Sequence, residues 1–344
     1  MKEKILVTGG TGYIGSHTVV ELQNAGYEVV IVDNLSNSRA DVVDYIEKTT
    51  GIRPAFEKVD CLDYAALEGV FVKHAGIKAI IHFAASKAVG ESVQKPLLYY
   101  RNNLVSLINL LELMPKHGVG GIVFSSSCTV YGQPDILPVT EEAPIKKAES
   151  PYGNTKQINE EIIRDTIKSG SPISAILLRY FNPIGSHPSA LIGELPNGVP
   201  QNLIPYLTQT AIGIREQLSV FGDDYNTPDG SCIRDYIYVV DLAKAHVVAI
   251  QRMLEGKQKE TVEVFNIGTG RGVSVLELVH AFEKSTGVKL NYKIVGRRAG
   301  DIEQVWANPE LANKELGWKA ETSLEDTLLS AWNWQLKLRE RGIQ

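Results

Sequence analysis

The chain has 344 residues, a net charge of −5 at pH 7 and 44% hydrophobic residues, and its mean hydropathy is −0.07. These values predict a soluble globular protein, long enough for two core-bearing units, with no electrostatic reason to bind nucleic acid or an anionic membrane. No apolar run reaches the ~20 residues that span a bilayer. Three isolated cysteines predict a reducing compartment, the cytoplasm, and neither a disulfide framework nor a metal site.

The first predicted element is a short buried strand at residues 4–8, which runs into a glycine-rich turn. The turn has the spacing G-x-x-G-x-x-G, fixed by Gly9, Gly12 and Gly15, and a helix is predicted over 14–24. Such a turn lets the backbone approach a pyrophosphate, and the free N–H groups of the helix N-terminus favour its negative charge. The pattern therefore predicts a dinucleotide site.

The next predicted strand, residues 27–32, ends on Asp33. A carboxylate at this point accepts a hydrogen bond from a ribose 2′-hydroxyl and repels a 2′-phosphate. We therefore predict NAD rather than NADP as the cofactor.

Strand and helix patterns alternate as far as residue 180. Further strands are predicted at 55–59, 79–85, 121–124 and 175–180, and helices at 62–73, 96–114 and from 150 onward. In the helix at 96–114, the residues with core spacing are Leu104, Leu107, Ile108 and Leu111. This order predicts the α/β class with a doubly wound parallel (Rossmann) sheet, whose ligands bind beyond the carboxyl ends of the strands.

The composition changes after Asn182, where Gly, Pro and Asn become frequent. Helices are predicted at 203–214, at 239–254, after 274 and at the C-terminus, with strands at 262–267 and 289–295. We predict an NAD-binding Rossmann domain over 1–182, to which 237–267 returns. A smaller α/β substrate domain is predicted from 183–236 and 268–344, and the cleft between the two is the default binding site.

Tyr152 and Lys156 lie four residues apart on a predicted helix that Ser150 caps and Pro151 begins. A phenol titrates near ~10, and a neighbouring ammonium favours the phenolate. Ser127 follows the strand at 121–124 and reaches the same sheet edge as the glycine turn. An exposed surface pair is the alternative for Tyr152 and Lys156 alone, but with Ser127 they predict a catalytic set beside a nicotinamide.

With these residues the chain resembles the extended short-chain dehydrogenases/reductases, and within them the UDP-glucose 4-epimerase family. The matching segments are 8–15, 125–132, 150–156, 179–183, 234–236 and 297–301. The resemblance implies reversible interconversion of UDP-glucose and UDP-galactose with tightly bound NAD. Hydride leaves sugar C4 and returns after the 4-keto sugar has turned over, while Tyr152 acts as the base, Ser127 relays the proton and Lys156 holds the nicotinamide ribose. It also implies a homodimer.

The resemblance implies two sets of contact residues. Those for the cofactor are Gly9, Gly12, Tyr13, Ile14, Gly15, Asp33, Asn34, Asn37, Ser38, Asp60, Cys61, Phe83, Ala84, Lys87, Asn102, Tyr152, Lys156 and Tyr180. Those for the UDP-hexose are Lys87, Ser127, Tyr152, Asn182, Asn202, Leu203, Phe221, Arg234, Arg298, Asp301 and Val305. In the second set, the two arginines would make forked, charge-assisted hydrogen bonds to the pyrophosphate, with Phe221 beside the uracil.

Two positions depart from the family pattern. Cys128 stands where many members have Ala, and a cysteine there is similar to the GDP-fucose synthases, but Asp33 argues against their NADPH. With no other support for that chemistry, Cys128 is interpreted as a small packed residue, as buried cysteines usually are. Val305 is intermediate between the Tyr and Cys of other members, which implies slower turnover of N-acetylated UDP-hexoses beside the main activity.

Two other functions fit the chain less well than epimerisation. A nucleotide-sugar 4,6-dehydratase usually has an Asp-Glu pair where this chain has Cys128-Thr129. A non-catalytic NAD-sensing protein typically lacks the Tyr–Lys pair.

Overall fold

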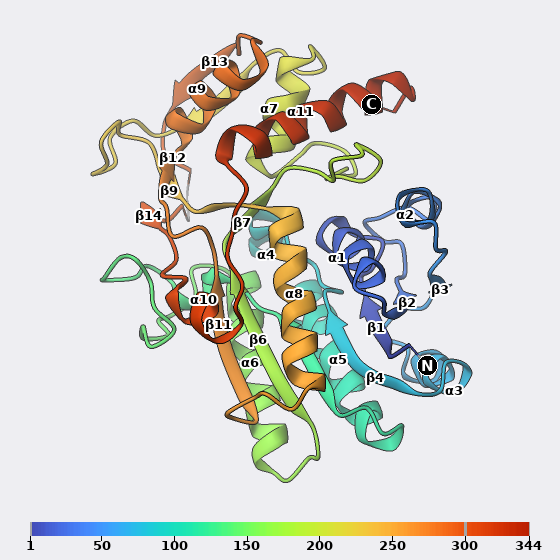
Figure 1. The fold of residues 1–344 in the computed structure, drawn as a ribbon. Coiled ribbons are helices and arrows are strands. Elements are labelled where there is room, and N and C mark those ends of the chain that lie inside the picture. Colours follow the sequence, from blue (N-terminus) through green and yellow to red (C-terminus); the bar gives the residue numbers. More distant parts are fainter. Residues whose placement is uncertain (1, 299–300, 344) are drawn as a thin grey trace.

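The computed structural model describes residues 2–298 and 301–343 (Figure 1). Seven parallel strands of this part of the chain form a central sheet in the order β11-β6-β5-β4-β1-β2-β3. The strands are β1 (Lys4–Thr8), β2 (Glu28–Val32), β3 (Ala55–Glu57), β4 (Ile77–His82), β5 (Gly121–Ser125), β6 (Ser174–Tyr180) and β11 (Val262–Ile267). The predicted doubly wound α/β fold is confirmed.

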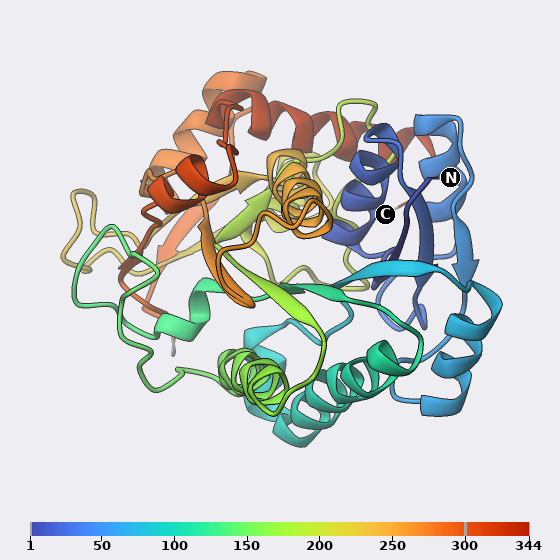
Figure 2. The same cartoon turned by 60° about the horizontal axis from the view of Figure 1, so that its bottom comes forward.

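Helices cover both faces of this sheet. One face carries α1 (Tyr13–Asn24), α2 (Val42–Thr50) and α8 (Val239–Leu254), and the other carries α3 (Tyr64–Lys73), α5 (Pro96–Lys116) and α6 (Pro151–Lys168). In Figure 2, α8 (orange) and α1 (dark blue) lie above the sheet, and α5 (teal) and α6 (light green) lie below it. Because both faces are covered, the strands are hydrophobic without alternation.

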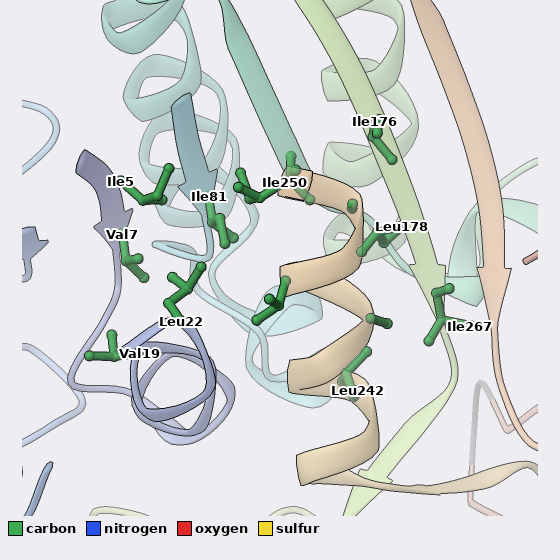
Figure 3. Packing of buried hydrophobic residues seen from close by; sticks show 14 of the residues in the cluster. Ile5, Val7, Val19, Leu22, Ile81, Ile176, Leu178, Leu242, Ile250 and Ile267 are labelled. Atoms are coloured by element: carbon green, nitrogen blue, oxygen red, sulfur yellow. The ribbon is translucent and has the colours of Figure 1, made fainter. Parts of the chain in front are cut away.

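Successive residues of β1 belong to different cores. Ile5 and Val7 join the cluster beneath α1 and α8, whereas Leu6 joins the cluster beneath α3, α5 and α6. Figure 3 shows the first cluster, in which Leu22 of α1 and Leu242 of α8 point toward the strands. A fully buried Leu or Ile stabilises the fold by roughly 1.5–3 kcal/mol, so these two layers fix the strand edge on which the site is built.

The predicted core stripe of α5 is partly wrong. Leu107 and Leu111 are buried, but Ile108 is 37% exposed. Apolar residues occur on more than one face of this helix, so periodicity alone did not identify the buried one. The buried face also includes Asn103, which hydrogen-bonds the loop after β4.

The chain after residue 181 builds a third hydrophobic cluster from residues 184–331. Its helices are α7 (Leu203–Ala211), α9 (Val275–Thr286) and α11 (Leu324–Glu340), which lie at the top of Figure 1. Its strands form three small sheets. The first joins β10 (Tyr236–Tyr238) to β7 (Asn182–Ile184), and the second places β9 (Ile233–Arg234) between β12 (Val273–Ser274) and β14 (Gln304–Val305). The third joins β13 (Tyr292–Val295) to β8 (Leu218–Phe221).

Two parts of the later chain return to the main sheet. β11 pairs with β6, and the segment with α10 (Glu310–Glu315) places Ala312, Leu316 and Trp318 in the first cluster. The domain limits at residues 182, 236 and 267 stay a prediction.

Several elements went unpredicted. They are α2, α4 (Val89–Gln94), α10 and the short 3-10 helix at Cys128–Tyr131, together with most of the two- to four-residue strands after residue 181. Each has fewer than ten residues, too few to establish a clear period. Among the residues described here, no helix has the length and apolar character required to cross a bilayer, and no His/Cys/Asp/Glu group arranged to hold a metal is found.

Candidate active site

The glycine-rich turn between β1 and α1 has no room for side chains. Gly9 has φ of 72°, and a Cβ on it would lie 2.8 Å from the backbone nitrogen of Ala84. A Cβ on Gly15 would overlap the carbonyl oxygen of Gly9. Gly12 is the N-cap of α1 and offers no capping side chain, so N–H groups of the first turn are free to bind an anion. Tyr13 and Ile14 begin α1. This geometry fits the pyrophosphate of a dinucleotide.

Asp33 stands beside that turn at the end of β2. One carboxylate oxygen accepts from the backbone N–H of Thr11 at 3.2 Å, and the other accepts from the N–H of Leu35 at 2.9 Å and the hydroxyl of Ser38 at 3.1 Å. The carboxylate is therefore fixed against the turn, where an adenosine ribose would lie, as the NAD prediction requires.

Some of the predicted cofactor residues near Asp33 are connected by hydrogen bonds. The side-chain amide of Asn34 donates to the carboxylate of Asp60 at 3.0 Å, and Cys61 is buried beside them. Asn37 is exposed on the loop after β2, and its contact with the cofactor stays a prediction.

The loop after β4, the start of α5 and the end of β6 bring the next predicted residues to the same edge. Phe83 N–H donates to the carbonyl of Thr8 at 3.0 Å, so the segment with Ala84 runs against the glycine turn. Asn102 of α5 donates to the hydroxyl of Ser86 at 3.2 Å. The Tyr180 hydroxyl lies 2.5 Å from that of Ser125.

Helix α6 positions the predicted catalytic pair. The Ser150 hydroxyl accepts from the backbone N–H of Gly153 at 3.1 Å and Pro151 is the first helical residue, which confirms the predicted cap. Lys156 Nζ donates to the carbonyl of Ser125 at 2.6 Å and lies 5.8 Å from the centroid of the Tyr152 ring. Helix and strand thus bring these groups to the carboxyl end of β5.

Burial controls the charges of this pair. It raises the pKa of Tyr152, with Tyr180 adding to the effect and the Ser127 side chain opposing it. It also lowers the pKa of Lys156 to about 8, an effect that the Glu160 carboxylate opposes. The predicted lowering of the phenol pKa is therefore not a property of the protein alone, because desolvation outweighs the other effects acting on Tyr152.

Cys128 begins the 3-10 helix directly after Ser127. Burial raises the pKa of its thiol to about 12, although Arg234 opposes the shift. The thiol is therefore neutral at pH 7 and packs against a small apolar cluster that includes Val305. A neutral, packed thiol agrees with the small-residue interpretation and does not favour proton abstraction by Cys128.

Three predicted UDP-binding residues gather at the outer end of β8. Arg298 forms a forked pair with Asp301, with the closest N–O distance 2.7 Å. Its guanidinium lies 5.4 Å from the ring centroid of Phe221, which is 39% exposed. An exposed ring beside a cation suits stacking on a base and contact with a phosphate. Ala299 and Gly300 of this predicted segment lie outside the described residues.

A second group lies on the sheet of β9 and β14. Arg234 and Val305 are opposite each other in the parallel register, and Asn182 N–H donates to the carbonyl of Asp235 at 3.0 Å. Asp235 is fully buried and accepts from the backbone N–H groups of Thr269 at 2.9 Å and of Ala307 at 3.2 Å. This unpredicted carboxylate thus ties the strand with Arg234 to the strand with Val305, which is only 3% exposed.

Glu194 joins two predicted ligand residues from different parts of the chain. Its carboxylate accepts from the side chain of Asn202 at 2.6 Å and lies 3.6 Å from Lys87 Nζ. Asn202 is the N-cap of α7, and Leu203 is its first residue. The segment around Glu194 has no helical or strand period, so the sequence carried no signal for it.

The fold and these residues define an NAD-dependent epimerase or dehydratase. Residues 5–268 match the NAD dependent epimerase/dehydratase family. The chain is 52% identical to the UDP-glucose 4-epimerase of Mus musculus over 97% of this chain and 96% of that protein. The chain therefore belongs to this family, among its UDP-glucose 4-epimerases.

Two solved structures are similar over nearly the whole length. The UDP-glucose 4-epimerase from Bifidobacterium longum, in complex with NAD⁺ and UDP, has 49% identity and a TM-score of 0.93, covering 97% of this chain and 98% of that one. The UDP-glucose-4-epimerase from Stenotrophomonas maltophila, with bound NAD and formylated UDP-arabinopyranose, has 47% identity and a TM-score of 0.95, covering 98% and 99%.

Proposed function

We propose that this chain interconverts UDP-glucose and UDP-galactose, using Ser127, Tyr152 and Lys156 beside NAD. The observation that carries the proposal is the position of Tyr152 and Lys156 at the sheet edge that also holds the glycine turn. The chemistry that NAD supplies when bound is reversible acceptance of a hydride from sugar C4, so no second redox substrate is consumed.

The protein's own task is to hold the sugar and move its proton. Tyr152 as phenolate takes the proton of the sugar 4-hydroxyl, with Ser127 hydrogen-bonding the same oxygen. Burial disfavours the phenolate, so the Lys156 ammonium and the positive nicotinamide together supply the charge that the phenolate needs. Without the positive charge of the ring the phenol would keep its proton, so Tyr152 would stay protonated and able to return that proton to the sugar oxygen in the second half of the cycle.

The cofactor residues proposed are the glycine turn with Tyr13 and Ile14 at the pyrophosphate, Asp33 and its neighbours at the adenosine, and Lys156 at the nicotinamide ribose. The forked bonds of Asp33 and the close packing of the turn support NAD. For UDP we propose Arg234 and Arg298 at the phosphates and Phe221 at the uracil, with Asn182, Asn202, Leu203 and Asp301 completing the grip. Two arginines match a pyrophosphate, because guanidinium forks bind phosphate oxygens in pairs.

The direct test supplies UDP-galactose to purified protein without added NAD. We expect UDP-glucose to form until the two sugars reach equilibrium, because the cofactor copurifies and is regenerated in every cycle. Consumption of NADPH with release of a reduced or deoxy sugar would contradict the proposal.

We further propose slower activity on UDP-N-acetylglucosamine and UDP-N-acetylgalactosamine. Support comes from Val305, which is smaller than tyrosine and lies opposite Arg234 in the sheet. Valine leaves space near the sugar without offering a hydrogen bond to the amide.

We also propose that the chain is a homodimer and acts in the cytoplasm. A row of exposed apolar side chains on α4 and α5 supports the dimer. Three cysteines that form no disulfide support a reducing compartment.

A further inference from the structure

Glu160 is a buried carboxylate that has no part in the reaction described above. It follows Lys156 by four residues and Tyr152 by eight on α6, so the three side chains share one helix face. Glu160 is 5% exposed. A charge so deeply buried requires partners, because an isolated carboxylate pays a large desolvation cost.

One partner is Arg179 of β6, itself 4% exposed. Arg179 Nε donates to one oxygen of Glu160 at 2.9 Å, and Nη2 donates to the other at 2.6 Å. Burial disfavours the charge of Arg179, but the hydrogen bonds and charge of Glu160 outweigh it and raise the pKa of the guanidinium. This two-point ion pair joins α6 to the sheet.

The other partner is Ser126, which is fully buried. Its hydroxyl donates to Glu160 at 2.6 Å. Ser126 lies between Ser125, whose carbonyl accepts from Lys156, and Ser127. Glu160 therefore holds the middle of the turn whose two ends contact Lys156 and provide the Ser127 hydroxyl.

The charge of Glu160 acts on Lys156 as well. Burial lowers the pKa of Lys156, and Glu160 opposes that effect. Other titratable groups that face Tyr152, Lys156 or Arg179 from neighbouring elements include His82 on β4, Glu91 on α4, Tyr99 on α5, Cys128 and Tyr131 in the 3-10 helix, and Tyr180 on β6. Burial keeps the imidazole, the phenols and the thiol neutral at pH 7, and Glu91 bonds to Lys95 and Tyr99. Without Glu160, two buried cations, Arg179 and Lys156, would lack their shared counter-charge.

We propose that Glu160 is a positioning residue for the epimerase reaction, fixing the Ser125–Ser127 turn through Ser126 and keeping Lys156 in its ammonium form. This inference rests on the proposed function. It differs from a role in stability alone, because it predicts an altered pH dependence in protein that is folded and carries NAD.

The first test is Glu160→Gln, with Glu161→Gln, its exposed neighbour on α6, as the matched control. Glutamine retains an acceptor for Ser126 but lacks the charge. Opposite charges nearby typically shift a pKa by one to three units. We measure kcat per folded, NAD-bound molecule across pH. We expect its alkaline limb, which we assign to loss of the Lys156 ammonium, to move down by about one pH unit. Glu161→Gln should follow the wild type.

Glu160→Gln removes the ion-pair partner of the buried Arg179 and could therefore prevent folding. Two further variants test the proposal in that case. Ser126→Ala leaves the ion pair intact and should lower kcat about tenfold, as expected for a displaced catalytic hydroxyl, without moving the alkaline limb. Glu160→Asp keeps the charge and should keep the limb in place.

Wild-type kcat in Ser126→Ala overturns the proposal, and so does an unshifted limb in folded Glu160→Gln or a shifted limb in Glu160→Asp. Failure of the proposed function is distinct from these outcomes, since it would appear as an inactive wild type.

Discussion

Tyr152, the proposed base, lies in a site that disfavours its charged form. Burial raises the pKa of its phenol, while Lys156 lies 5.8 Å from its ring centroid. A base of this kind is neutral until a second positive charge arrives, which couples proton removal to the presence of the oxidised cofactor. When no oxidised cofactor is bound, the phenol therefore stays neutral, and the site avoids the cost of a buried, unpaired phenolate.

Tyr152→Phe should leave the fold and the bound NAD in place and remove the proton acceptor. Loss of a general base typically costs ~10²–10⁴-fold in rate, and we expect kcat to fall within that range while the nucleotide released on denaturation stays at the wild-type amount. Tyr64→Phe, which removes a phenol that contacts Lys116 at the end of α5, is the matched control. Turnover within a factor of two of wild type in Tyr152→Phe would rule out this phenol as the base.

Val305→Tyr should abolish turnover of UDP-N-acetylglucosamine and spare UDP-glucose. Val305 is 3% exposed and packs in the cluster with Cys128, and we propose that a larger side chain there takes up space needed by the acetamido group. Overpacking costs about 1–3 kcal/mol, or roughly 5- to 150-fold in rate. Parallel kinetics on both sugars measure the effect, with Val305→Cys as the smaller counterpart that should retain the N-acetyl activity. An equal loss on both sugars would show that Val305 does not line the acetamido pocket.

At the level of elements, the sequence predicted what strong local signals determine. The glycine turn, the Asp33 strand and the capped start of α6 each combine a period with a residue of fixed conformational or hydrogen-bonding role, and the structure has them where predicted. The buried face of α5 was predicted only in part because Ile108 is as apolar as Leu107, and only the sheet and α6 decide which one is covered.

Within the candidate site, the missed residues are those whose partners are distant in sequence. Glu160 is on the same helix face as Lys156, and its spacing could have signalled a role. Glu194 and Asp235 carried no such signal, because their contacts with Lys87, with Asn202 and with Thr269 arise only when separate segments fold together.

Helices α1 and α8 contain buried histidines that predict acid sensitivity. Each ring donates Nδ1–H to the carbonyl four residues earlier, His17 to Tyr13 at 2.7 Å and His246 to Leu242 at 2.9 Å. Burial lowers the pKa of His17 to about 3 and of His246 to about 4 from 6.5. Between pH 6.5 and 4 the unfolded chain therefore binds more protons, so the free energy of unfolding must fall as the pH falls.

Denaturant unfolding measured across that window checks this, and His246→Leu should reduce the slope of the unfolding free energy against pH by about one proton. His280→Gln, at an exposed position on α9, should leave the slope unchanged because its ring is already in water. A slope in His246→Leu equal to that of the wild type would mean that His246 is not buried as a neutral ring.

At the scale of the whole molecule, the helices on the second face of the sheet expose apolar side chains to solvent. Helices α4 and α5 lie on the outside of the second layer and expose several apolar side chains. They are Val93 at 62%, Leu97 at 81%, Leu98 at 48%, Val105 at 36% and Ile108 at 37%. Leu97, Val105 and Ile108 lie at spacings that share one face of α5. Several large apolar side chains exposed on one helix face are typical of an interface.

The pair of substitutions Leu97→Glu and Ile108→Glu should convert the proposed dimer into monomers. In an apolar two-fold interface, each introduced carboxylate would lie near the same carboxylate of the second subunit. Both would lose hydration without gaining an opposite charge. Light scattering after size exclusion measures the mass, and we expect the dimer mass for the wild type and the monomer mass for the double variant. Val72→Glu, at a valine of α3 that is 67% exposed, introduces the same charge away from the row and should leave the dimer intact. A monomeric wild type, or a double variant that stays dimeric, would show that this face of α5 does not hold two copies together.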